Sequence, residues 1–364
     1  MKIRQLTQKE LNEILIIDRV NPENGTLFGV PTRRKPADRL MLVIGTGGCG
    51  KEVIRRTILS ADQKMAPSYR QFVKFLIIDS AVGELSVLDG LGIDYISTTC
   101  DGLAQRLNPP QGFFTDFVYK PYPVSSSPSS MRMTGKIKFY DQPQAGITND
   151  EILRRKVNDL FSGPWSIHIG KQLDIMIISG TAGGNGSGTF MDIAASVRQA
   201  VANRVNVKFF GFLMLPDTTE TFANSTDDAK HMMVNGYAAL KELESYMSIP
   251  MEPDRKELFK APNSAYDQVI NTAVPLFDYP ILISGKYDTA VSMISETLMS
   301  FIGDSGGMFD ARSFLSGYQC AKSAMLLSSR VSEDGIVKPD EVPEDSHSYC
   351  AMAIMKEVKN CLPI

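Results

Sequence analysis

A glycine cluster directly after a run of apolar residues is the first feature of the sequence with clear chemical potential. Residues 41–53 read MLVIGTGGCGKEV, which is typical of a buried strand that ends in a phosphate-binding turn. Glycines in such a turn let successive backbone N–H groups point at one anion, and the following helix adds the positive end of its dipole. Two patterns fit in part: the dinucleotide fingerprint G-x-G-x-x-G over residues 45–50, and a P-loop that ends in Gly50-Lys51. The P-loop requires Ser or Thr next, where this sequence has Glu52.

A second glycine cluster lies much further along the chain. Residues 183–188 read GGNGSG and stand between an apolar run at 173–179 and a helical pattern that starts at Phe190. This cluster combines four glycines with two small polar residues, which is hard to explain as a plain connecting turn, although that alternative stays open. We therefore predict a second phosphate-binding turn at this position.

Two strand–glycine–helix units in one chain argue against the simplest classes of phosphate-binding protein. A P-loop protein needs one such turn and a hydroxyl that holds Mg²⁺, which Glu52 cannot supply. A dinucleotide fold needs an acidic residue about 20 residues after the fingerprint. Here Asp79 follows Gly50 by nearly 30 residues. A Rossmann-type NAD(P) oxidoreductase is further disfavoured because no His, Tyr-x-x-x-Lys or Cys constellation is well placed for catalysis.

The elements that must position these turns are predicted from hydrophobic periodicity. We expect strands at 40–44, 72–78, 173–179, 207–215 and 276–284. We expect helices at 7–19, 52–58, 150–161, 190–201, 226–247 and 289–302. Residues 100–148 are rich in Pro, Ser and Gly and are predicted to be a long loop or insertion, a candidate partner surface. Continuous apolar strands that alternate with helices indicate an α/β fold, with a Rossmann-like parallel sheet and helices on both faces.

Composition excludes several other classes. The length of 364 residues suggests about two domains, or one domain with a smaller appendage. A net charge of −3 gives no electrostatic case for nucleic acid. The five cysteines are widely spaced without a C-x-x-C pair, which makes zinc and disulfides unexpected and favours a cytoplasmic setting. No signal peptide and no membrane-spanning segment are expected.

Three stretches together resemble the tubulin/FtsZ superfamily. Residues 182–188, AGGNGSG, resemble its signature G-G-G-T-G-S/T-G, with Ala for the first Gly and Asn for Thr. Residues 47–50, GGCG, resemble the first nucleotide loop of the same superfamily. Residues 235–243, NGYAALKEL, look like the helix after the fifth strand of bacterial tubulin-like proteins. The resemblance covers roughly residues 38–312.

This resemblance implies a GTP/GDP site on the loops at the carboxyl ends of the sheet. The implied phosphate-binding residues are Gly47, Gly48, Cys49, Gly50, Gly183, Gly184, Asn185, Gly186, Ser187 and Gly188. Asp79 would approach the terminal phosphate through Mg²⁺, or it could simply cap a helix. Glu220 would bind the ribose, or it could be a solvated carboxylate. Asp288 begins the helix that would read guanine.

The resemblance also implies hydrolysis coupled to self-assembly. In this superfamily, acidic residues after the central helix act on the nucleotide of the next subunit in a head-to-tail filament. Asp304 and Asp310 are the candidates, with turn-forming carboxylates as the alternative, because the family's N-x-D pattern is absent. A non-polymerising nucleotide sensor that binds a protein partner is the rival function.

Three regions follow from this interpretation. Residues 1–38 would form an N-terminal helix and connection, residues 39–302 the nucleotide-binding domain with its central helix, and residues 303–364 a reduced C-terminal region.

Overall fold

The computed structural model describes residues 34–80, 88, 90–98, 132–140, 147–168, 170–204, 206–248 and 275–303. The helix expected at 7–19 lies outside these residues. Asp304, Asp310 and nearly all of the expected C-terminal region also lie outside them. No helix in the described ranges is both long and apolar enough to cross a membrane.

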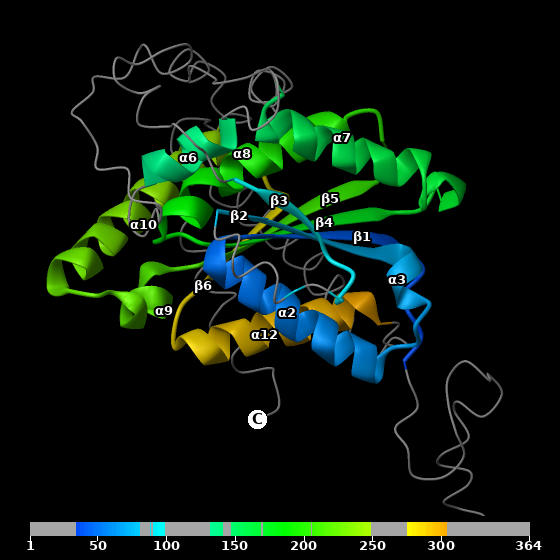
Figure 1. Cartoon of the computed structure of the whole chain (residues 1–364), viewed down its shortest axis with the longest axis horizontal. Coiled ribbons are helices and arrows are strands. Elements are labelled where there is room, and N and C mark those ends of the chain that lie inside the picture. Colours follow the sequence, from blue (N-terminus) through cyan, green and yellow to red (C-terminus); the bar gives the residue numbers. More distant parts are fainter. Residues whose placement is uncertain are drawn as a thin grey trace, which may run out of the picture.

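A six-stranded sheet forms the centre of the molecule (Figure 1), and its strands run in the order β3-β2-β1-β4-β5-β6. The strands are β1 (Leu40–Thr46), β2 (Val73–Asp79), β3 (Asp94–Ser97), β4 (Leu173–Gly180), β5 (Val207–Met214) and β6 (Tyr279–Ile283). All five pairings are parallel. The chain order reverses between β1 and β4, and such a switch point is where open α/β sheets bind ligands.

Helices cover both faces of this sheet (Figure 1). One face carries α2 (Gly47–Lys64) and α12 (Tyr287–Ile302), and the other carries α6 (Arg132–Tyr140), α7 (Asn149–Ser162), α8 (Gly184–Ala200) and α10 (Thr226–Ser248). The short elements are α3 (Tyr69–Phe72), η4 (Ser166–His168), α9 (Pro216–Thr219) and η5 (Glu220–Phe222).

Two hydrophobic cores result from the alternation of side chains along the strands. In β1, Leu40, Leu42 and Ile44 face the core under α7 and α8. Met41 and Val43 face the core under α2 and α12. Burial on both faces explains why the strands read as continuous apolar runs in the sequence.

The predicted α/β class and the five predicted strands are confirmed, and the differences lie at the helix bounds and in several short elements that were not predicted. Helix α2 begins at Gly47 rather than at residue 52, and α8 begins at Gly184 rather than at residue 190. The glycine clusters are therefore the first turns of helices, which their low helix propensity concealed. Helix α6 lies inside the stretch predicted to be a loop, and the exposed strand β3 was not predicted.

Candidate functional site

The candidate site lies at the carboxyl ends of β1 and β4, where two helices begin next to each other. Helix α2 follows its N-cap Thr46, whose side chain accepts no hydrogen bond from the helix, and helix α8 follows its N-cap Gly183, which has no side chain. The first N–H groups of a helix have no partner inside it, so both helices present donors at this edge. Two positive helix ends at one edge favour an anion.

The two glycine turns are in direct contact through their backbones. Gly47 has a φ of +66°, which favours glycine. A Cβ atom on Gly47 would lie 3.1 Å from the backbone N of Gly186. The contact therefore joins the first turns of α2 and α8 into one surface.

The outer sides of the two turns are open. A Cβ atom added to Gly48 or Gly183 would meet no atom of the described residues within 4 Å, and Gly48 is exposed. The backbone at these positions can thus be approached by a ligand. This open cradle, with donors on two sides, fits the phosphates of a nucleotide.

Two of the other predicted glycines fill packing contacts. A Cβ atom on Gly50 would lie 2.5 Å from the carbonyl oxygen of Ile178, so Gly50 lets α2 pack closely on β4. A Cβ atom on Gly188 would collide with the carbonyl of Arg132 in α6. Their lack of a side chain is explained by helix packing, whatever else their backbone does.

Asp79 lies next to this cradle at the end of β2. Its side chain is buried, and Oδ1 accepts hydrogen bonds from the backbone N–H of Ser80 at 2.7 Å and from Nδ2 of Asn185 at 3.1 Å. Its Oδ2 lies 3.5 Å from Nζ of Lys51 in α2. The structure thus brings together predicted residues from three strand ends, and it adds Lys51 as a cation.

Asn185 and two threonines fix the inner wall of the cradle. Nδ2 of Asn185 donates to the carbonyl of Ile78 at 3.3 Å as well as to Asp79. The hydroxyls of Thr46 and Thr189 lie 3.0 Å apart, and Thr189 also donates to the carbonyl of Asn185 at 2.8 Å. These bonds tie β1, β2 and α8 together, so the geometry of the cradle is preorganised.

Ser187 faces α6 and is fully buried. Its hydroxyl oxygen accepts a hydrogen bond from Nε of Arg132 at 2.9 Å. The Arg132 guanidinium also donates to both carboxylate oxygens of Glu242 in α10, at 2.9 and 2.7 Å. Arg132 and Glu242 escaped the sequence analysis because residues so far apart leave no local pattern.

Cys49 is half-buried in the first turn of α2. A Cβ atom on Gly180 would lie 2.9 Å from its Sγ, which places the thiol against the end of β4. Burial raises the pKa of Cys49 to about 12, against a smaller lowering by a backbone hydrogen bond and a further small rise from Asp79. The thiol is therefore neutral at physiological pH and cannot repel a phosphate.

Glu52, the residue that breaks the P-loop pattern, is held by arginines of its own helix. It accepts hydrogen bonds from Arg55 at 2.8 Å and from Arg56 at 2.7 Å. The hydrogen bond from Arg55, followed by that from Arg56, lowers the pKa of Glu52 against an opposing effect of burial. Arg56 also donates a hydrogen bond to Asp288 at 2.8 Å, so this chain of ion pairs joins α2 to α12.

Glu220 and Asp288 lie on the β5–β6 side of the glycine turns. Glu220 is exposed in η5, and the side chain of Asp288 is 83% exposed at the start of α12. The loops that carry them are joined by Asp217, which accepts hydrogen bonds from Ser284 Oγ at 2.5 Å and from the backbone N–H of Gly285 at 3.0 Å. Asp217 was not singled out from the sequence.

A dedicated metal cage is absent from the described ranges, where no three His, Cys, Asp or Glu side chains gather. Asp79 is the carboxylate that lies beside the cradle. Mg²⁺ at nucleotide sites is held by phosphates, waters and one or two carboxylates, so Asp79 fits such an ion as one ligand beside the phosphates.

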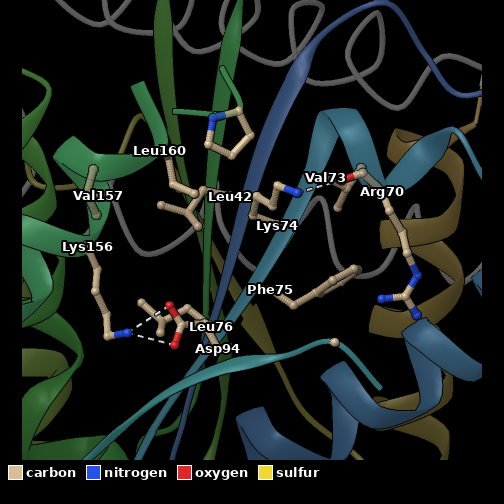
Figure 2. A pocket seen from close by; sticks show the side chains of 12 residues that line it. Leu42, Arg70, Val73, Lys74, Phe75, Leu76, Asp94, Lys156, Val157 and Leu160 are labelled. Atoms are coloured by element: carbon tan, nitrogen blue, oxygen red, sulfur yellow. Dashed lines mark hydrogen bonds and ion pairs between the residues drawn. The ribbon is translucent and has the colours of Figure 1, made fainter. Parts of the chain in front are cut away.

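A pocket of about 330 Å³ lies elsewhere, over the first half of β2 and against α7 (Figure 2). Leu42, Leu76 and Leu160 form part of its apolar wall. Lys156 and Asp94 form an ion pair of 2.7 Å at its side. It is separate from the glycine turns and does not contribute to the candidate site.

Comparison with known proteins agrees with this arrangement. A family model described as tubulin-like matches residues 129–353, which is more than half of the chain. No curated protein matches.

Solved structures give weaker matches. CetZ2 of Haloferax volcanii, a GTPγS-bound protofilament, is 13% identical, with 80% of this chain and 72% of that chain covered and a TM-score of 0.38. An FtsZ mutant of M. jannaschii is 13% identical, with 74% and 55% covered and a TM-score of 0.38. TubZ of Bacillus thuringiensis serovar israelensis is 15% identical, with 80% and 59% covered and a TM-score of 0.37.

These scores are too low to argue from. The chain spans about half the length of the Clostridium botulinum phage TubZ and FtsZ structures that it matches, 48% and 55%.

Proposed function

Because the chain belongs to the tubulin-like family, we propose that its paired glycine turns bind a guanine nucleotide, GTP or GDP. The observation that carries this proposal is the backbone contact between Gly47 and Gly186, which places the N-termini of α2 and α8 around one open space. Phosphates are the ligands that such paired helix ends favour.

The two turns have different tasks in this proposal. Gly47, Gly48 and Cys49 offer backbone N–H groups from α2, and Gly183, Gly184, Asn185 and Gly186 offer them from α8. Gly50 and Gly188 shape the cradle by allowing close packing, and Ser187 does so through its hydrogen bond from Arg132. Asp79 would take part in holding Mg²⁺, which would supply charge neutralisation for the phosphates.

The rest of the nucleotide would extend toward β5 and β6. Glu220 is exposed there and is free of any ion pair among the described residues, which suits a carboxylate that accepts hydrogen bonds from ribose hydroxyls. Asp288 would lie on the guanine side. Its ion pair with Arg56 holds the start of α12 in place.

We further propose that the protein is a GTPase that assembles head to tail, with Asp304 and Asp310 acting on the nucleotide of the neighbouring subunit. Head-to-tail contacts that do not close generate filaments. A carboxylate supplied in this way would activate water only after assembly.

The proposal is tested by calorimetry with GTP, GDP, ATP and NAD on the purified protein. Selective binding of GTP and GDP supports it. Preference for ATP or NAD would mean that the cradle belongs to another nucleotide class. Sedimentation with GTP then separates assembly from its rival: binding with no pelleting at any concentration favours a non-polymerising sensor.

Asp304→Ala and Asp310→Ala address the catalytic step. Both variants should bind GTP like the wild type and hydrolyse it more slowly. Loss of GTP binding instead would show that these residues have a structural role.

A further inference from the structure

Lys51 makes a long ion pair with Asp79 at the edge of the glycine turns. Its side chain is 13% exposed, and Nζ lies 3.5 Å from Oδ2 of Asp79. An ammonium–carboxylate hydrogen bond is ordinarily about 2.7–2.9 Å long. By contrast, Oδ1 of Asp79 is firmly held by Ser80 and Asn185. The carboxylate is thus fixed, and its other oxygen, Oδ2, makes the longer contact with the ammonium of Lys51.

The order of the strands places this pair on one flank of the candidate site. The glycine turns stand at the ends of β1 and β4, in the middle of the sheet. Glu220 and Asp288 lie on the β5–β6 flank, and Asp79 ends β2 on the opposite flank. A nucleotide with its ribose near Glu220 and its inner phosphates on the turns would direct its last phosphate toward β2.

We infer that Lys51 binds the terminal phosphate of a nucleoside triphosphate and that Asp79 holds the ammonium ready for it. This inference rests on the proposed nucleotide site. Lysine has a flexible stem and a compact charge, so Nζ can move from Oδ2 of Asp79 to a phosphate oxygen without rearrangement of α2. Asp79 would remain anchored by Ser80 and Asn185.

Two consequences distinguish this role from a purely structural ion pair. A diphosphate does not reach the β2 flank, so Lys51 should favour GTP over GDP. A cation fixed in the protein also takes over part of the charge neutralisation that Mg²⁺ otherwise supplies. Loss of Lys51 should therefore make GTP binding more dependent on Mg²⁺.

The test is calorimetric titration of GTP and GDP, each with Mg²⁺ and with EDTA, into the wild type and Lys51→Met. A hydrogen bond to a charged group corresponds to roughly 10- to 100-fold in affinity. We expect Lys51→Met to lose about 10-fold or more in GTP affinity and less than about 3-fold in GDP affinity, with a steeper Mg²⁺ requirement. Lys51→Arg should retain most of the preference for GTP.

Control variants separate the role of Lys51 from general effects. Lys156→Met removes a lysine that is paired with Asp94 away from the site, and it should leave both affinities unchanged. Lys51→Met removes the cation beside Asp79 and costs stability. Lys51→Gln removes the charge but keeps a hydrogen-bond donor beside Asp79, and it should fold and still lose the preference for GTP.

The outcomes distinguish this inference from the proposed function. If the wild type binds neither GTP nor GDP, both fail. If the wild type binds both and Lys51→Met keeps the same ratio of GTP to GDP affinity, the inference fails and the proposed site stands. Equal losses for GTP and GDP would likewise assign Lys51 to the structure of the cradle.

Discussion

The two glycine turns look alike in the sequence but differ in their surroundings. In the first turn, Gly48 is exposed and Cys49 is half-buried. In the second, every residue from Gly184 to Val197 is buried. The α2 turn thus presents an open surface at Gly48, whereas the α8 turn is open at its N-cap Gly183 and enclosed by α6 and the strands from Gly184 onward. Most glycines of the second turn therefore serve close packing, whereas the first turn has more surface open to a ligand.

The largest expected effect on stability comes from a substitution in the enclosed part of the second turn. Gly188→Val should destabilise the fold by about 3 kcal/mol, because its Cβ would collide with the carbonyl of Arg132 in α6. Close-packed backbone can relieve such a collision only by shifting, which costs free energy. Gly48→Ala is the matched control in the open turn and should change stability by less than about 0.5 kcal/mol. Urea unfolding measures both, and equal effects would remove the distinction between the turns.

The reactivity of the Cys49 thiol tests how accessible the first turn is. Because burial raises its pKa to about 12, the thiolate fraction at pH 8 is small. Alkylation by iodoacetamide should be roughly 50-fold slower than for an ordinary thiol, after allowance for the greater nucleophilicity of a more basic thiolate. The rate should rise with pH up to about 12. Peptide mass spectrometry measures it, and ordinary reactivity at pH 8 would show that the thiol is more accessible than its surroundings indicate.

A smaller effect is expected at Ser187. Ser187→Ala removes the oxygen that accepts from Nε of Arg132, and it should cost about 1 kcal/mol of folding stability. Nucleotide affinity should stay within about 3-fold of wild type, because the hydroxyl faces α6 rather than the open space. Losing a hydrogen bond to a phosphate would instead lower the affinity by more than about 3-fold. Calorimetry and urea unfolding together decide this, and lost affinity with unchanged stability would assign the hydroxyl to the phosphate.

The smallest effect concerns the ion pairs on α2. Glu52→Gln should lower stability by about 0.5 kcal/mol, because partly exposed pairs at this spacing are weak. The pKa of Glu52 is lowered in the fold, so its contribution is present above the ordinary value of 4.5 and is lost as the pH falls through the lowered one. Unfolding at pH 7 and at pH 3 should show a smaller difference between variant and wild type at the lower pH.

Much of the fold could be predicted from the sequence because both faces of the sheet are buried. Continuous apolar runs identified β1, β2, β4, β5 and β6. Strand β3 escaped because its first two residues are exposed and it has four residues in all. Helix α6 escaped because it lies in a stretch rich in Pro and Ser, and its position depends on the close approach of Gly135 to the carbonyl of Gly184.

The site was predictable where it depends on local sequence and not where it depends on distant contacts. The glycine clusters marked the two strand-to-helix junctions, although both helices begin earlier than predicted, and the end of β2 pointed to Asp79. The partners of Ser187 and Asp79 did not follow from the sequence, since Arg132 and Lys51 reach them only through the packing of α6 and α2. Asp304 and Asp310 stay predictions.

The most direct measurement of the central claim is calorimetric titration of GTP into Gly48→Glu, Gly183→Glu and Gly170→Glu. Among the residues that the structure describes, a Cβ atom at each position meets nothing within 4 Å, so all three variants should fold. If both glycine turns bind phosphate, a carboxylate at residue 48 or 183 should abolish binding by charge repulsion. The same charge at residue 170, before β4, should leave it unchanged. Wild-type affinity in either of the first two variants would contradict the account.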